Sequence, residues 1–216
     1  IALGQNRIWQ HKFPKLGTKD TDPYYSPEMT GILGTNIRMV NKFYTANGLP
    51  ITEDKTWMYG DGYALERERD LAYTNVVPLG VDVLALHLKR EPRFYASIAA
   101  PGLYWQMGKS TNLLVDAYQS GLFGLKQQRI DPNMAQNISG YYVKKGLRSE
   151  FKLPDYSSEI SSLNQSASVV MRLAELYLIA AEAWNEYEGP NGPHRSQIFD
   201  RLNAVRLRAG IPTVQE

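Results

Sequence analysis

Residues 171–184 read MRLAELYLIAAEAW, and their apolar side chains recur at the spacing of an α-helix. Leu173, Leu176, Ala180 and Trp184 share one face, because a helix brings residues three or four positions apart onto the same side. The charged residues within this stretch interrupt its apolar character, so it is too polar for a membrane span. It predicts an amphipathic helix that starts near residue 168 and packs one face against a partner.

A second helix is predicted after a short turn. Residues 189–193 read GPNGP, and this turn ends the first helix because glycine and proline do not continue one. Ser196 is the expected N-cap of the next helix. A second apolar stripe then runs through Ile198, Leu202, Val205 and Ala209. Gly210 and Pro212 end it, so the pattern predicts an antiparallel helical hairpin.

Small side chains would allow the two helices to approach closely, as in tetratricopeptide-type pairs. They are Ala180, Ala181 and Ala183 on the first helix and Ala204 on the second. A single hairpin of this kind cannot bury both of its faces, since such repeats become stable by stacking on neighbours. We therefore expect either further helices outside this chain or the rest of the chain to cover it.

The remainder of the chain is rich in turn signals, which leave little room for long regular elements. One helix is expected over residues 78–89, and short strands over 94–99 and 140–143. We divide the chain into a loop-rich lobe, residues 1–165, and the hairpin, residues 166–216. The predicted fold class is mainly α: a tetratricopeptide-like helical hairpin packed against an irregular loop-rich lobe with short helices and a few short strands.

Composition excludes several classes of protein. The 216 residues carry a formal charge of +2 that is spread along the chain, which argues against a nucleic-acid partner. The absence of cysteine rules out disulfides and thiolate metal sites. The three histidines are scattered without the spacing of a metal site, so we predict neither a metal nor another cofactor.

Several motifs together resemble one protein family. The stretch 171–184 is followed at hairpin spacing by LNAVRLRAGIP at 202–212. MVNKFYTANGLPI at 39–51, REPRFYASI at 90–98 and SGYYVKK at 139–145 precede them in the expected order. The chain resembles SusD/RagB outer-membrane nutrient-binding lipoproteins over roughly residues 36–214, as part of their C-terminal lobe.

The resemblance implies a function as well as a fold. Such a protein binds polysaccharide, oligosaccharide or a similar nutrient without catalysis and delivers it to a TonB-dependent, SusC-like outer-membrane transporter. It is a lipoprotein exposed on the cell surface, with its lipid anchor upstream of this chain. Because the family's N-terminal helical repeats and its arginine- and glutamate-rich terminal helix are not found here, we expect the chain to be a fragment at both ends.

A sugar ring has an apolar face and a rim of hydroxyls, so a glycan site combines flat aromatic side chains with polar neighbours. Aromatic residues with such neighbours occur in turn-rich segments. We predict ligand contacts at Trp9, Tyr24, Tyr25, Trp57, Tyr59 and Asp61. For any one of these rings, packing into the core is the competing interpretation. Five other rings are expected to be core residues: Tyr104, Trp105, Tyr177, Trp184 and Tyr187.

Two other functions remain open at the level of sequence. The hairpin could belong to a protein-interaction scaffold that binds no sugar. Alternatively, the acid pairs Glu66 with Glu68, or Asp54 with Asp61, could serve a glycan hydrolase or lyase, which needs two carboxylates about 5 to 10 Å apart. Such pairs arise readily in charged surface segments, so we predict that the chain is not an enzyme.

Overall fold

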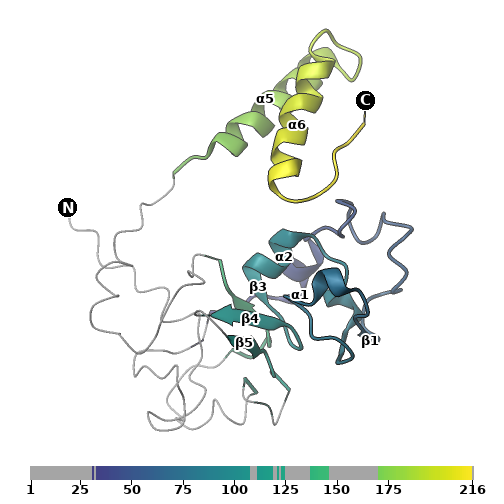
Figure 1. Ribbon diagram of the computed structural model, residues 1–216. Helices are drawn as coiled ribbons and strands as arrows, with labels where there is room; N and C mark the ends of the chain where they lie inside the picture. Colours follow the sequence, from purple (N-terminus) through teal and green to yellow (C-terminus); the bar gives the residue numbers. More distant parts are fainter. Residues whose placement is uncertain are drawn as a thin grey trace, which may run out of the picture.

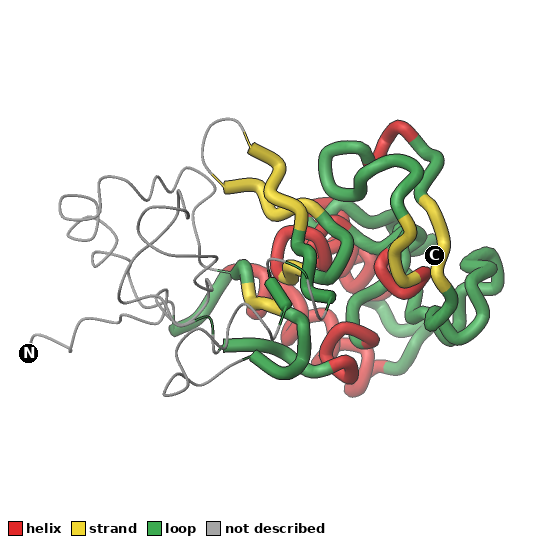
Figure 2. Tube along the Cα trace, turned by 90° about the horizontal axis from the view of Figure 1, so that it is seen from below, coloured by secondary structure: helices red, strands yellow, loops and turns green. Residues whose placement is uncertain are grey.

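A computed structural model describes residues 31, 33–107, 111–118, 121, 123–124, 137–145 and 170–215. In this part of the chain, a helical hairpin stands beside a lobe of short elements (Figure 1). Loops and turns form much of the lobe, and its helices and strands are short (Figure 2). No helix of the described residues is long and apolar enough to cross a membrane. The mainly α, loop-rich fold class is confirmed.

The described part of the lobe contains ten short elements. They are α1 Ile37–Asn41, β1 Leu65–Arg67, η2 Leu71–Tyr73, β2 Asp82–Leu84, η3 Ala85–His87, α2 Pro92–Ser97, β3 Ile98–Ala99, β4 Tyr104–Met107, β5 Thr111–Leu114 and β6 Tyr142–Val143. The strands form three two-stranded antiparallel pairs, β1 with β2, β3 with β6, and β4 with β5. Such small pairs are not stable alone, so side-chain packing and loop hydrogen bonds must hold the lobe together.

Two predictions for the lobe were partly or wholly wrong. No α-helix forms over 78–89: the chain turns at Gly80, pairs as β2, and then makes the 3-10 turn η3. Val83 is buried between neighbours that are not, which is the alternation of a strand. Most of 94–99 is helical because Pro92 sits at the first position of α2, where proline is favoured. The strand expected within 140–143 is confirmed as β6.

A buried arginine ties the lobe together. The guanidinium of Arg90 donates hydrogen bonds to the carbonyl oxygens of Leu86 (2.6 Å), Val40 (2.8 Å), Phe43 (2.6 Å) and Tyr44 (3.3 Å). It thereby joins α1 and the loop after it to η3, across nearly fifty residues of sequence. Burial lowers the pKa of Arg90 to about 10, so the side chain still carries its charge at neutral pH.

Aromatic side chains fill the space around this arginine. Phe94 packs edge-on against Phe43 and Tyr95. The Arg90 guanidinium lies 4.9 Å from the centre of the Phe94 ring. The fully buried His87 stacks beside Phe94, and its ring nitrogens contact the Pro101 carbonyl oxygen (3.1 Å) and the Tyr141 hydroxyl (3.0 Å). Neither contact is a carboxylate that would stabilise a charged imidazole.

The predicted hairpin is confirmed as α5 Leu173–Glu188 and α6 Arg195–Arg208. The predicted N-cap Ser196 is wrong, because α6 begins one residue earlier and His194 precedes it. His194 stacks on Trp184 with ring centres 4.8 Å apart, and its backbone N–H and ring both contact the Glu188 carboxylate. These contacts close the turn between the helices.

The five rings expected in the core have different outcomes. Trp105 is buried as predicted, whereas Tyr187 is 90% exposed at the end of α5, so that prediction is wrong. Tyr177 and Trp184 lie between the helices, where the Arg201 guanidinium contacts both rings, and Tyr104 is half-buried in β4. The hairpin is thus closed partly by cation–π contacts, which are favourable for arginine over aromatic faces.

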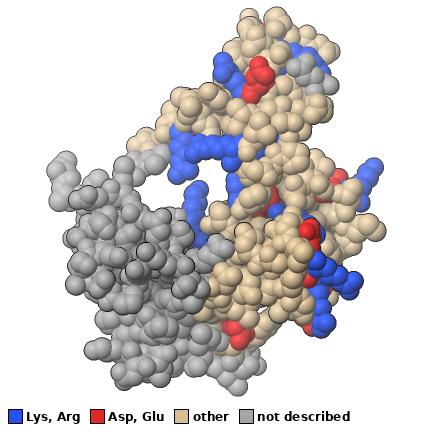
Figure 3. Space-filling view, in the orientation of Figure 1, with Lys and Arg blue, Asp and Glu red and all other residues tan. Residues whose placement is uncertain are grey.

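The hairpin contacts the lobe through the end of α6. Arg206 Nη2 donates to the Gly48 carbonyl oxygen at 2.9 Å, and Ile211 is buried beside this glycine. Basic side chains gather where hairpin and lobe meet on the face shown in Figure 3. Much of α5 remains uncovered, since Leu173, Leu176 and Ile179 are each about half exposed or more. The hairpin therefore has an unpartnered apolar face, as a single repeat is expected to have.

Replacing Arg90 tests its role in holding the lobe. Arg90→Ala leaves several buried carbonyl oxygens without a donor, and we expect a loss of about 3–5 kcal/mol in the free energy of unfolding. Arg38→Ala, at an exposed position of α1, is the control and should change stability by less than about 0.5 kcal/mol. Urea denaturation followed by circular dichroism measures both. Equal stability of the two variants would contradict the role of Arg90.

His87 predicts how stability depends on pH. Burial, with a smaller contribution from Arg90, lowers the pKa of His87 to about 3, despite its contact with the Pro101 carbonyl oxygen. The unfolded chain takes up this proton near pH 6.5, so stability is full above that pH and falls between about 6.5 and 3, by up to about 1.4 kcal/mol per pH unit. Denaturation of wild type and His87→Gln across this range measures it. An identical pH slope for both proteins would refute the assignment.

Candidate functional site

The predicted ligand contacts fall into two groups. Trp9, Tyr24 and Tyr25 lie outside the described residues. Trp57, Tyr59 and Asp61 lie in one loop between α1 and β1. This loop makes a tight turn at Gly62, whose φ of 80° and close approach to Trp57 and Leu86 leave no room for a side chain. The turn brings the three residues to the edge of the lobe core.

Trp57 is a core ring in this arrangement. It is only 7% exposed, and its indole N–H donates to the Leu88 carbonyl oxygen at 3.1 Å. Its ring packs edge-on against Tyr59, with ring centres 5.2 Å apart. Trp57 therefore offers little exposed ring surface to a ligand. Its apolar surface is buried in the core, and its indole N–H is already bonded to Leu88. It instead fixes the position of the half-buried Tyr59.

Asp61 shapes the turn after Tyr59. Its side chain is exposed, and Oδ1 accepts a hydrogen bond from the Tyr63 backbone N–H at 3.0 Å. An aspartate that bonds the backbone two residues on stabilises a turn. Asp61 thus holds the loop and still presents its carboxylate to solvent beside Tyr59.

The structure places a second tyrosine near Tyr59. Tyr73, at the end of η2, is half-buried and packs against the same core cluster. The two phenols are close enough that Tyr59 contributes to raising the pKa of Tyr73. Sequence reasoning did not select Tyr73, because its distance from Tyr59 along the chain gives no hint of proximity. We call the group of Tyr59, Tyr73, Glu68, Asp70 and Lys89 the Tyr59–Tyr73 surface.

Lys89 connects the charged members of this surface. Its ammonium lies 3.1 Å from Glu68 Oε1 and 2.7 Å from Asp70 Oδ2. It also lies 4.3 Å from the centre of the Tyr73 ring, within the range of a cation–π contact. Lys89 has a φ of 51°, which is unusual for a residue with a side chain. Neither this conformation nor the ion pairs could be inferred from local sequence.

Glu68 is the buried carboxylate of the group. Only 3% of its surface is exposed, and Oε1 accepts hydrogen bonds from the backbone N–H groups of Arg69 (3.0 Å) and Asp70 (2.8 Å). Its second oxygen, Oε2, is buried and has no hydrogen-bond partner in the part of the chain that the structure describes. Unpaired buried oxygens are uncommon, because each loses its hydration without a replacement.

The two phenols titrate above their ordinary range. Burial raises the pKa of Tyr59, Glu68 and Glu66 raise it further, and Lys89 lowers it. Burial also raises the pKa of Tyr73, which Lys89 lowers and Glu68 and Asp70 raise. Both phenols thus remain uncharged near neutral pH. Each interacts electrostatically with two carboxylates, which raise its pKa, and with one ammonium, which lowers it. The surface combines aromatic rings with hydrogen-bonding charges, which are the elements of a sugar-binding site.

Asp54, one of the acids considered for catalysis, lacks the chemistry of a general acid. Asp54 is buried, and although burial raises its pKa, hydrogen bonds from Thr45, Thr56 and Asn47 lower it well below the usual range. A general acid of a glycosidase needs a raised pKa instead. Its partner Asp61 lies in the turn described above, and Glu66 is exposed on β1 while Glu68 is buried. No group of three metal-ligating side chains occurs among the described residues.

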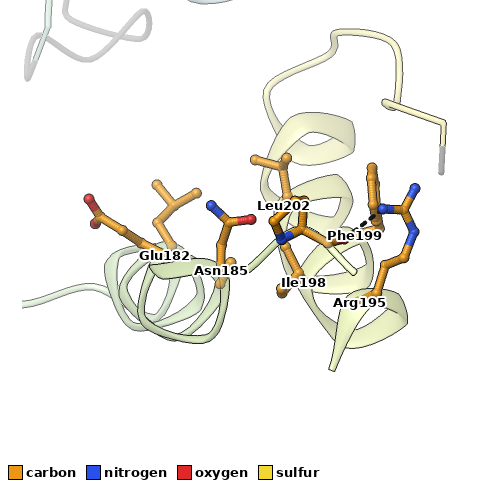
Figure 4. A pocket seen from close by; sticks show the side chains of 9 residues that line it. Glu182, Asn185, Arg195, Ile198, Phe199 and Leu202 are labelled. Carbon is orange, nitrogen blue, oxygen red and sulfur yellow. Dashed lines mark hydrogen bonds between the residues drawn. The ribbon is translucent and has the colours of Figure 1, made fainter. Parts of the chain in front are cut away.

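A groove of about 460 Å³ lies elsewhere, between α5 and α6. Glu182 and Asn185 lie on its α5 side, and Ile198 and Leu202 lie on its α6 side (Figure 4). The lining is mainly apolar, with few polar groups to orient a sugar. Its location on the partly uncovered hairpin suits packing with a neighbouring helix better than capture of a polar ligand.

Solved structures with the same fold are known. A structure of BT4246 matches with a TM-score of 0.64 at 21% identity, over 95% of this chain and 32% of that chain. The structure of selenomethionine BT4246 gives a TM-score of 0.59 at 20% identity, over 95% and 33%. A SusD-like protein, BF3747, from Bacteroides fragilis NCTC 9343 gives 0.52 at 23% identity, over 89% and 32%. This chain thus spans about a third of the length of each.

Sequence comparison agrees with the fold. The family model described as SusD family matches residues 6–216, which is nearly the whole chain. This match extends the similarity to residues 6–35, where the sequence motifs alone showed little resemblance to the family. No curated protein matches the chain significantly.

Proposed function

This chain belongs to the SusD family, and on that premise we propose that it binds a glycan at the Tyr59–Tyr73 surface as part of a nutrient-uptake protein. One observation carries the proposal: the half-buried Tyr73 ring lies beside a lysine held by two carboxylates, and the half-buried Tyr59 packs against the same core cluster, where Glu68 and Lys89 act on its pKa. Rings provide the apolar contact that the C–H face of a sugar needs, and the charged groups can bond its hydroxyls. The core beneath holds these groups in place before a ligand arrives.

The other predicted contacts have distinct roles in this proposal. Tyr59 and Asp61 face the ligand, and Trp57 supports Tyr59 from within the core. Trp9, Tyr24 and Tyr25 remain proposed contacts from the N-terminal segment. Replacing each by alanine would show whether that segment contributes to the same site.

The proposed affinity is weak. One aromatic face that loses about 100 Å² of exposed apolar surface gains roughly 2.5 kcal/mol, before the cost of ordering is subtracted. Two such faces place the dissociation constant on the order of millimolar to micromolar. This range suits a protein that must release its cargo to a transporter.

The wider role is proposed from family membership. The protein acts without catalysis, as a lipoprotein on the outer surface of the outer membrane, and passes its ligand to a TonB-dependent, SusC-like transporter. Release of product from an oligosaccharide would contradict this view.

A second function is supported by the hairpin. Its exposed apolar side chains on α5 and the groove beside α6 favour a protein-interaction scaffold that binds no sugar. Under this alternative, the Tyr59–Tyr73 surface has a structural role only. Carbohydrate binding that is lost on replacing Tyr59 or Tyr73 would support the glycan-binding function over the scaffold.

Single substitutions of the two tyrosines test the proposed site. We expect Tyr59→Ala and Tyr73→Ala each to weaken binding of an oligosaccharide about tenfold, because each removes one aromatic face. Calorimetric titration with soluble polysaccharides and oligosaccharides measures the affinity, after wild type identifies which of them bind.

Tyr187→Ala is the matched control, since this tyrosine is highly exposed on the hairpin. It should leave glycan affinity unchanged. Binding that survives both site substitutions would move the ligand away from the Tyr59–Tyr73 surface, and no binding to any glycan would contradict the proposed function itself.

A further inference from the structure

The charges around the Tyr59–Tyr73 surface do not balance. Residues 59–89 contain five carboxylate side chains and three basic ones, a formal charge of −2 within a chain whose total is +2. The basic side chains are Arg67, Arg69 and Lys89. This segment supplies all five residues of the surface, so its charge acts directly on a bound ligand.

Two of the three basic side chains in this segment are already paired. Lys89 holds Glu68 and Asp70 and contacts the Tyr73 ring, which occupies its ammonium. Arg67 pairs with Asp82 through two hydrogen bonds, at 2.5 and 3.3 Å, across the β1–β2 ladder. Within residues 59–89, an anionic ligand would have to break one of these ion pairs or rely on the exposed Arg69.

The negative charge at the site exceeds the positive charge paired with it, because one ammonium, that of Lys89, is shared by the Glu68 and Asp70 carboxylates. Glu68 is buried, and among the described residues its Oε2 has no hydrogen-bond donor. A charge in such surroundings is screened much less than one at the surface. Its effect reaches both phenols, since Glu68 helps to raise the pKa of each. An anion resting on these rings would meet the same repulsion.

We propose that the Tyr59–Tyr73 surface selects neutral or amino-bearing glycans and rejects uronate-containing or sulfated ones, because Lys89 is committed to Glu68 and Asp70 and the Glu68 carboxylate is only partly compensated. This inference rests on the proposed function and adds the substrate class to it. The selection acts by repulsion, which is an effective way to discriminate between ligands of similar shape.

Matched ligands test the selection. A panel of neutral gluco-, xylo-, manno- and galacto-oligosaccharides is titrated first, and those that bind are compared with their own sulfated derivatives or with derivatives oxidised to carboxylates at a terminal CH₂OH. We expect the anionic form to bind at least about tenfold more weakly at low salt, and the difference to narrow as salt screens the repulsion. Anionic forms that bind as well as neutral ones, or better, overturn the inference.

Two variants connect the selection to named residues. Glu68→Gln keeps the shape of the side chain and removes its charge, so the preference for neutral ligands should shrink. Asp70→Asn acts at an exposed position and frees part of the Lys89 ammonium, so it should also strengthen binding of the anionic form. If Glu68→Gln fails to fold, Asp70→Asn still tests whether the charged residues of the surface cause the preference. An unchanged preference in a folded variant would exclude these residues as its source.

The outcomes also separate this inference from the proposed function. If neither neutral nor anionic glycans bind, the proposed function fails, and the inference fails with it. If glycans bind through Tyr59 and Tyr73 without regard to charge, the function stands and only the selection is wrong. Tyr187→Ala again serves as the control, with both affinity and preference unchanged.

Discussion

The described lobe depends on one buried cation whose charge is neutralised mainly by backbone carbonyl oxygens. Arg90 donates to four of them, in α1, in the loop that follows and in η3. Its neighbour Glu91 adds a reciprocal contact by accepting from the Tyr44 backbone N–H at 2.9 Å. Three small two-stranded pairs could not hold these loops, because short isolated ladders are marginal in water. The rigid guanidinium of arginine carries five N–H donors, so it can donate to carbonyl oxygens that have no partner within a sheet or helix.

The same segment places the candidate site. The carbonyl oxygen of Leu86 accepts from Arg90, that of His87 from the Tyr95 hydroxyl, that of Leu88 from Trp57, and that of Lys89 from the Ala46 N–H. Four consecutive carbonyls are thus fixed by partners distributed along the lobe. This explains how Lys89 can hold a positive φ, a conformation that costs of order 1 kcal/mol or more and persists only where surrounding contacts determine it. Its ammonium is thereby presented to Glu68, Asp70 and Tyr73.

Sequence reasoning succeeded where structure is local. The hairpin could be predicted because apolar spacing, the glycine–proline turn and helix geometry all act within about twenty residues. The lobe could not, since β2 depends on pairing with β1, and the loops that Arg90 joins come from segments nearly fifty residues apart. For the proposed site, Tyr59, Asp61 and Trp57 were predicted from their loop, and these contacts stay predictions, although Trp57 is buried. Tyr73, Lys89 and Glu68 were not predicted, because only the folded chain brings the segments around residues 59, 73 and 89 together.

The two parts of the chain differ in how complete their packing is, and this difference has a physical consequence. The lobe closes its core around Arg90, with Phe94, Leu88 and Val40 fully buried. The hairpin buries little of α5 apart from Ala181, and no residue of α6 is fully buried. Among the described residues of this part, Arg206, Gly210 and Ile211 contact the lobe. The lobe can therefore hold a site in fixed geometry from its own contacts, whereas the hairpin gains most by packing against another apolar surface. The proposed ligand site and the exposed apolar face of the hairpin thus lie on different parts of the chain, and a change to one need not disturb the other.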